Sequence, residues 1–264
     1  MIKAAFFDID GTLLNYKTGH LIPQTTKDAL AELHRRGIKV VICTGRPTAQ
    51  LPSCITDGFP GLEDAFDAYV TMTGSICYDK DGVYADVPID HVIAERFVSH
   101  VNEGLFDALL LNREGAFSNR HSDLVCQLEE LVNFHYPERD FNEELKKPVY
   151  QFCAFLPPER EHIVKELMSD CIVTRWCDIF CDVVPATSSK PKGIQHTLEH
   201  MGLKREETIA FGDGGNDATM LEFCEIGVAM GNGTEDAKAA ADYVTTDVDK
   251  EGIPNALRHF GLID

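Results

Sequence analysis

The sequence predicts an α/β protein with a doubly wound, mostly parallel sheet, into which a second, α+β domain is inserted. Apolar strands alternate with helical patterns at both ends of the 264-residue chain, which is typical of βαβ units. Between them, from about residue 88 to residue 184, strands outnumber helices and several links are too short for a crossover. An antiparallel sheet with helices on one face follows. The predicted domains are a Rossmann-like core of residues 1–84 and 185–264, and an inserted domain of residues 85–184.

The composition narrows the class of partner. The chain has 24 basic and 43 acidic residues, a net charge of −19, and such a surface repels nucleic acid and anionic membranes. We see neither an apolar run near the roughly 20 residues that span a bilayer nor a signal peptide. The nine cysteines include no Cys-x-x-Cys pair, so we expect buried, reduced thiols and a cytoplasmic location.

The first predicted element is a buried strand over residues 2–7, and it ends in Asp8-Ile9-Asp10-Gly11. Side chains alternate along a strand, so Asp8 and Asp10 can face one small volume. Open α/β folds place ligands at this end of their strands. Two carboxylates forced together bind a cation, share a proton or divide a chemical task. The alternative is an ordinary Asp-rich turn.

The second strand repeats this pattern. A helix begins after Pro23 and stops at Gly37, and the apolar run 39–43 leads into Thr44-Gly45-Arg46. A right-handed βαβ unit places Thr44 at the same sheet edge as Asp8. Thr44 can also cap a following helix, and both interpretations can hold together.

The later elements follow from the same periodicities. Completing the first part of the core, we expect a strand at 68–72 and a hairpin of 75–78 with 83–85. In the insert we expect helices near 92–101, 124–134 and 159–168, with strands at 107–111, 115–118, 149–155, 171–175 and 179–184. After it we expect helices at 190–201, 218–221, 235–241 and 253–260, with strands at 208–211, 226–230 and 243–244.

Three strands therefore end in polar sequences, the third being followed by Gly212-Asp213-Gly214-Gly215-Asn216-Asp217. If the sheet is parallel, these ends meet at one edge. Each pair of carboxylates about 4 Å apart costs roughly 4 kcal/mol at an effective dielectric near 20, and Lys190, which opens a helix near this edge, cannot neutralise four of them. All-oxygen ligands favour a hard cation, and Mg²⁺ is the one that commonly also binds phosphate.

Such a site would let the two N-terminal carboxylates divide their work. A carboxylate can attack a phosphoryl group and form an aspartyl phosphate. Its neighbour can protonate the leaving alkoxide and then deprotonate the attacking water. Thr44, Lys190 and Mg²⁺ would stabilise charge on the phosphoryl oxygens.

Together these motifs resemble the four ordered signatures of the haloacid dehalogenase superfamily, and the insert of about 100 residues resembles the α/β cap of its Cof-type sugar-phosphate phosphatases. The resemblance implies a Mg²⁺-dependent phosphatase acting on small phosphorylated metabolites such as hexose or pentose phosphates. It implies Asp8 as nucleophile and Asp10 as acid/base, with Mg²⁺ on the Asp8 carboxylate, the Asp10 carbonyl and Asp213. It further implies that Gly45, Asn216 and Asp217 support the phosphate and the metal.

The chain departs from the family pattern in two places. Two other functions would use the same or similar groups. A Lys-Gly pair is common in the third signature and would favour Lys192, whereas the register of the following apolar residues favours Lys190. Relatives often carry Asn-Gly where this chain has Thr73-Gly74. A phosphomutase uses the same aspartyl phosphate, and a non-enzymatic receiver combines similar groups but is about half this length. We expect no nucleic-acid or membrane partner, and a monomer or weak homo-oligomer.

Overall fold

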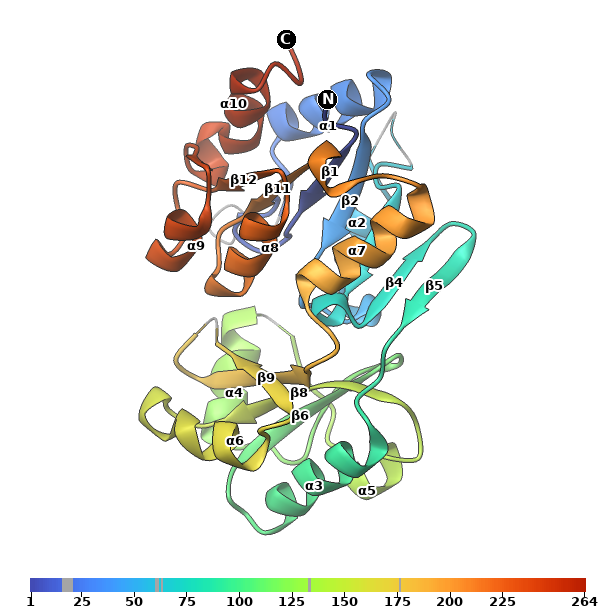
Figure 1. The fold of residues 1–264 in the computed structure, drawn as a ribbon. Coiled ribbons are helices and arrows are strands. Elements are labelled where there is room, and N and C mark those ends of the chain that lie inside the picture. The colour runs from blue at the N-terminus through green and yellow to red at the C-terminus, as the bar shows by residue number, and fades with distance from the viewer. Residues whose placement is uncertain (16–20, 60–61, 63, 133, 176) are drawn as a thin grey trace. The chain divides into compact units, whose positions relative to one another are not determined.

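A computed structural model describes residues 1–15, 21–59, 62, 64–132, 134–175 and 177–264 of the chain (Figure 1). It divides into two compact units. The first unit comprises Met1–Arg46, Leu51–Asp86 and Lys190–Asp264. The second unit comprises Pro47–Gln50 and Val87–Ser189. The second unit is thus continuous in sequence apart from one short segment, and the first is formed by both ends of the chain.

The described part of the first unit is built on an eight-stranded sheet with the strand order β13-β12-β11-β1-β2-β3-β4-β5. Neighbouring strands from β13 to β3 run parallel, and β4 and β5 continue the sheet as an antiparallel hairpin. The predicted doubly wound, mostly parallel sheet is confirmed. The strands are β1 (Ala4–Phe7), β2 (Lys39–Cys43), β3 (Ala68–Thr71), β4 (Ile76–Asp79), β5 (Gly82–Asp86), β11 (Thr208–Gly212), β12 (Ile226–Ala229) and β13 (Tyr243–Val244).

Helices cover both faces of this sheet because its central strands are apolar on both sides. Phe7 belongs to the hydrophobic cluster beneath α1 and α10, whereas its neighbour Phe6 belongs to the cluster beneath α7, α8 and α9 (Figure 1). This is the alternation expected of a strand. The helices of the unit are α1 (Gln24–Arg35), α2 (Ser53–Thr56), α7 (Lys190–Met201), α8 (Ala218–Phe223), α9 (Glu235–Ala240) and α10 (Gly252–His259).

The register of the central strands sets the position of the polar residues that follow them. β1 lies between β11 and β2, with Phe7 opposite both Phe211 and Ile42. The rings of Phe7 and Phe211 stack with their centroids 4.8 Å apart. Because all three strands run parallel, the residues that come next in each strand emerge at one edge of the sheet.

The described part of the second unit contains a five-stranded antiparallel sheet with the order β7-β6-β8-β10-β9. One face packs against α3 and α6, and the other carries α4 through Val125 and Leu128. Helices on a single face were predicted, and this was wrong, because β6 and β8 are apolar on both faces. The elements are α3 (His91–Asn102), β6 (Asp107–Asn112), β7 (Gly115–Ser118), α4 (Asp123–Val132), α5 (Phe141–Glu144), β8 (Val149–Phe155), α6 (Glu161–Leu167), β9 (Cys171–Thr174) and β10 (Phe180–Pro185).

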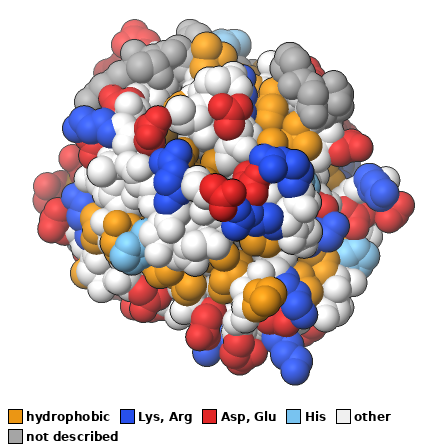
Figure 2. All heavy atoms as spheres, turned by 90° about the horizontal axis from the view of Figure 1, so that it is seen from above, with side chains coloured by type: hydrophobic (Ala, Val, Ile, Leu, Met, Phe, Trp, Pro, Cys, Tyr) orange, Lys and Arg blue, Asp and Glu red, His pale blue; other side chains and the backbone are white. Residues whose placement is uncertain are grey.

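Three features of the structure can be compared with the predictions made from composition: the surface charges, the cysteine thiols and the lengths of the helices. On the face shown in Figure 2, Asp and Glu side chains lie interspersed with Lys and Arg side chains. All nine cysteines carry free thiols; five are buried, but Cys126 is exposed, so the expectation of buried thiols fails there. None of the helices that the structure describes combines the length and the apolar composition that a membrane span requires.

Candidate active site

Asp8 and Lys190 form the centre of the candidate site. Asp8 follows β1 directly, and its backbone N–H still donates to Phe211 O at 3.0 Å. Lys190 opens α7 and is 1% exposed. Its Nζ lies 2.7 Å from Asp8 Oδ1 and 2.5 Å from Asp217 Oδ1. Lys192 is exposed one half-turn further along the helix, so the geometry brings Lys190, and not Lys192, to the carboxylates.

The loop after β11 turns its carboxylates back toward β1. Asp217 Oδ2 accepts hydrogen bonds from the backbone N–H groups of Asp213 and Gly214, each at 2.9 Å. Thr12 Oγ1 donates to Asp213 Oδ1 at 2.9 Å. Asn216 lies in the same short 3₁₀ turn as Asp217 and is half-buried. Both ends of the first unit's sequence are therefore joined around one group of acidic side chains.

Glycine is required where the two loops meet. Gly11 has φ +87°, and a Cβ at that position would lie 2.1 Å from Asp213 Oδ2, far inside van der Waals contact. Asn232 secures the same turn, since its Nδ2 donates to Gly11 O at 2.9 Å while its Oδ1 accepts from Val248 N at 2.8 Å. Sequence reasoning missed Asn232. Its signal was Gly231-Asn232-Gly233 at the end of β12, the pattern that marked the other strand ends.

Asp10 faces a different partner from Asp8. Arg46 Nε and Nη2 lie 2.6 and 2.7 Å from the two oxygens of Asp10, a bidentate arrangement that fixes both the position and the plane of a carboxylate. Both side chains are about a quarter exposed. No role for Arg46 follows from the sequence alone, because a bidentate partner across two strand ends has no local signature.

Replacing Arg46 with methionine is therefore expected to lower kcat/KM by about 10- to 100-fold, because a carboxylate displaced by about 1 Å from its working position can cost 10²-fold. Lysine at this position keeps the charge but not the fork, and should restore only part of the loss. Steady-state hydrolysis rates test this. Arg120→Met is the matched control, since Arg120 holds Asp107 with the same two-pronged geometry in the second unit. An Arg46→Met enzyme as efficient as the control would remove Arg46 from the site.

Thr44 is buried one residue beyond β2. Its Oγ1 accepts from Arg46 N at 3.1 Å, which forms a tight local turn. The capping alternative does not hold, because the next helical turn begins only at Thr48. Thr44 O accepts from Thr73 N at 3.1 Å, and a Cβ at Gly45 would lie 3.6 Å from Thr73 Oγ1.

Backbone strain accompanies this contact. Met72 and Thr73 have φ +48° and +54°, a left-handed conformation that costs a non-glycine residue on the order of 1–3 kcal/mol. The strained pair donates its backbone N–H groups to Arg46 O and Thr44 O. The strained conformation therefore lets these two backbone groups hold the loop that carries Thr44 and Arg46.

The electrostatics of the group are unbalanced. Carboxylate oxygens of Asp8, Asp213 and Asp217 lie within 4.8 Å of one another. Burial, followed by the Asp217 charge, raises the pKa of Asp8 well above its usual range and that of Asp213 to about 7. Burial alone would lower the pKa of Lys190, but Asp217 and Asp8 outweigh it and raise that pKa. A neighbouring cation would lower the pKa of both aspartates, and buried carboxylate oxygens are the donors that a hard divalent cation prefers.

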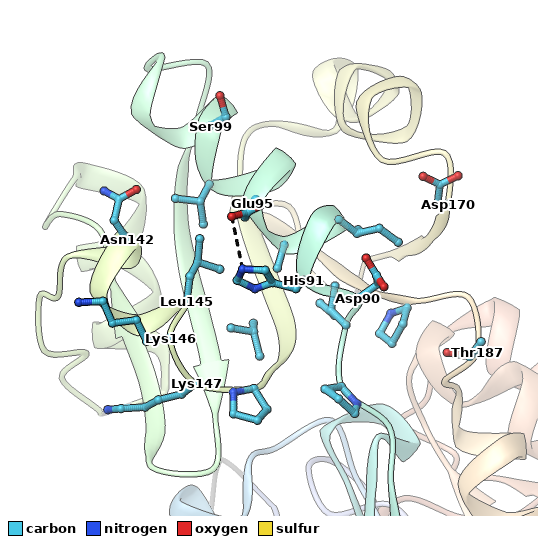
Figure 3. A pocket seen from close by; sticks show the side chains of 18 of the residues that line it. Asp90, His91, Glu95, Ser99, Asn142, Leu145, Lys146, Lys147, Asp170 and Thr187 are labelled. Carbon is cyan, nitrogen blue, oxygen red and sulfur yellow. Dashed lines mark ion pairs between the residues drawn. The ribbon is translucent and has the colours of Figure 1, made fainter.

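The second unit carries a groove of about 1350 Å³ along α3 (Figure 3). His91 and Glu95 form an ion pair on its wall at 3.3 Å, and Lys146 and Lys147, from the segment between α5 and β8, also line it. None of the residues that line this groove belongs to the predicted site. The predicted site residues all lie instead in the first unit.

Comparison with known proteins gives a consistent result. Residues 5–257 match the family model of haloacid dehalogenase-like hydrolases. The Bacillus subtilis protein YkrA is 31% identical over 264 residues, covering 99% of this chain and 98% of its own. Among solved structures, the HAD subclass IIB sugar phosphatase BT4131 matches with a TM-score of 0.90 and 36% identity, covering 99% of this chain and 100% of that one. BT1666 from Bacteroides thetaiotaomicron matches with 0.89 and 37%, covering 100% and 96%.

Proposed function

The chain belongs to the haloacid dehalogenase-like hydrolase family, and from that premise we propose that it is a Mg²⁺-dependent phosphatase of small phosphorylated metabolites. The observation that carries the proposal is the buried contact of Lys190 Nζ with Asp8 Oδ1 and Asp217 Oδ1, at 2.7 and 2.5 Å. In this contact a buried ammonium group lies beside Asp8, directly after the end of a strand. Asp10 follows Asp8 by two residues along the chain. BT4131 and BT1666, which are described as phosphatases, support the same activity.

In the first step of the proposed reaction, an Asp8 oxygen attacks phosphorus and forms a P–O bond. The P–O bond to the substrate alcohol breaks, and Asp10 gives its proton to the leaving alkoxide. Lys190 stabilises negative charge on the phosphoryl oxygens. Thr44 Oγ1 already accepts from Arg46 N, which leaves its O–H proton to donate to a phosphoryl oxygen.

In the second step, a water molecule attacks the phosphorus of the aspartyl phosphate and Asp10, now ionised, takes its proton. The P–O bond to Asp8 breaks, and inorganic phosphate leaves with the carboxylate restored. Arg46 holds the ionised Asp10 in one orientation as it accepts this proton. The two carboxylates thus have separate tasks, since Asp8 carries the phosphoryl group and Asp10 moves the proton.

The residues present fit a bound Mg²⁺. Asp8, Asp213 and the carbonyl of Asp10 would hold it, and Asp217 would support it while pairing with Lys190. Asp8 is buried and Asp213 is half-buried, and their pKa values are raised even though the Lys190 charge lowers them, so a divalent cation would stabilise their ionised forms. When bound, the ion would supply positive charge to the transferring phosphoryl group. Gly45 and Asn216 would border the phosphate.

Sugar phosphates are the proposed substrates. BT4131 is described as a sugar phosphatase, and the net charge of −19 disfavours large polyanionic substrates. The second unit would act as the cap that selects the leaving group. The free thiols fit a reducing compartment, so we propose a cytoplasmic enzyme, monomeric or weakly self-associating.

A panel of hexose, pentose and nucleotide monophosphates, assayed with Mg²⁺ and again after chelation, tests the proposal. We expect release of inorganic phosphate that requires Mg²⁺ and is fastest with a sugar phosphate. Hydrolysis that survives chelation would overturn the metal requirement. A phosphomutase would need a bisphosphate activator and return the phosphoryl group to its substrate, so steady phosphate release from a monophosphate alone excludes it. A receiver-like protein would become phosphorylated without turnover.

A further inference from the structure

A second group of metal-ligating side chains lies in the second unit and plays no part in the proposed reaction. His121 precedes α4, Glu129 lies within it and His135 follows it. One ligand atom from each lies within 4.8 Å of the others. The rings of His121 and His135 stack with centroids 4.7 Å apart. The chain before and after α4 therefore converges on one carboxylate of the helix.

The distances within the group suit a small tetrahedral cation. Glu129 Oε1 lies 3.3 Å from His121 Nε2 and 3.1 Å from His135 Nδ1. Bonds of about 2.0–2.1 Å from zinc to nitrogen or oxygen, arranged tetrahedrally, place neighbouring ligand atoms roughly 3.3 Å apart. Tyr136 O lies 3.0 Å from His121 Nε2 and offers a fourth donor atom on the same side.

The hydrogen-bond partners of His121 are all acceptors. Its Nδ1 faces Glu138 Oε1 at 3.1 Å, while its Nε2 faces Glu129 Oε1 and Tyr136 O. A neutral imidazole has one N–H, so one of its nitrogens would direct a lone pair at an oxygen. A metal cation at Nε2 removes this conflict, as a second ring proton would. Glu138 then accepts from Nδ1–H, which is the carboxylate–histidine arrangement that commonly orients a metal ligand.

We propose that His121, Glu129 and His135 form a binding site for a divalent transition-metal ion, with Zn²⁺ the best match. Two imidazoles and one carboxylate form a donor set suited to zinc rather than to Mg²⁺, which prefers oxygen alone. Glu138 orients His121, and the Tyr136 carbonyl or water completes the coordination. The ion would tie both ends of α4 together and so stabilise this side of the second unit.

Zinc binding by the whole protein tests the site without reference to turnover. The protein is dialysed against micromolar Zn²⁺ in millimolar Mg²⁺, which occupies the oxygen-rich site, and its metal content is measured. We expect the parent protein to bind one zinc per chain. The variants His121→Ala and His135→Ala should lose this zinc, because their affinity for it should be at least 100-fold weaker than that of the parent. Glu138→Gln should weaken binding by about 10- to 100-fold, as loss of an orienting partner does. His135 is 71% exposed, so its replacement should leave the fold intact.

Two controls address other zinc ligands. His91→Ala removes an imidazole that pairs with one glutamate elsewhere in the second unit, and Cys126→Ser removes the exposed thiol of α4. Both should keep one zinc per chain, and Zn²⁺ should raise their melting temperature as in the parent protein. The proposal is overturned if the parent binds no zinc under these conditions. It is equally overturned if His135→Ala binds as tightly as His91→Ala, which would leave the two histidines as partners in ordinary ion pairs.

Discussion

Replacing Asp8 with asparagine is expected to reduce kcat by about 10⁴-fold or more, the scale seen when a covalent nucleophile is removed from an enzyme. The amide has nearly the shape of the carboxylate but cannot attack phosphorus. Release of inorganic phosphate from the best substrate of the panel measures the loss. Mass spectrometry of the quenched parent reaction should find an added phosphoryl group on the peptide that contains Asp8, and none in the variant.

The same substitution should not destabilise the protein. Burial and the Asp217 charge raise the pKa of Asp8, so its ionised form is disfavoured in the folded state, and removing that charge relieves this cost at neutral pH. Lys190 keeps Asp217 as a partner. A urea unfolding midpoint equal to or above that of the parent would separate lost chemistry from lost structure. Undiminished hydrolysis by a folded Asp8→Asn variant would refute the assignment of the nucleophile.

The sheet was predictable because its strands carry strong local signals. β1, β2 and β11 are apolar runs that each end in a polar turn, and parallel topology then brings the residues after them to one edge. The same reasoning anticipated the antiparallel sheet of the second unit. It failed for α4, because the helix pattern alone does not say which face of a sheet a helix covers. It also missed α5, a single turn capped by Asp140 within a polar segment.

The sequence indicated which residues belong to the candidate site more readily than it indicated which of them contact one another. The sequence placed Asp8, Thr44 and Asp213 near one another, but it did not show that Arg46 holds Asp10 or that Asn232 holds Gly11. Such pairs join residues 36 and 221 positions apart, and no periodicity encodes them. Burial favours Lys190 over Lys192, since the side chain of Lys190 is buried against Asp8 and Asp217 while Lys192 is exposed.

Replacing Lys190 with methionine is expected to have the largest combined effect on stability and rate. The side chain is fully buried between Asp8 and Asp217, and removing one partner of a buried ion pair typically costs about 3–5 kcal/mol, because the remaining charges lose their compensation. The loss of charge stabilisation at the phosphoryl group should also lower kcat by about 10²- to 10³-fold. Urea unfolding and steady-state kinetics measure the two effects separately.

Lys192→Met is the matched control, since Lys192 lies on the same helix but is exposed, and it should behave as the parent does. A double variant, Lys190→Met with Asp217→Asn, separates the two effects further. It removes one of the uncompensated charges, so it should recover part of the lost free energy of unfolding, but it should not recover kcat, because the Lys190 ammonium is still missing from the phosphoryl group. Near-normal turnover by Lys190→Met beside an inactive Lys192→Met would reverse the assignment, and recovery of kcat in the double variant would reduce Lys190 to a structural counter-ion.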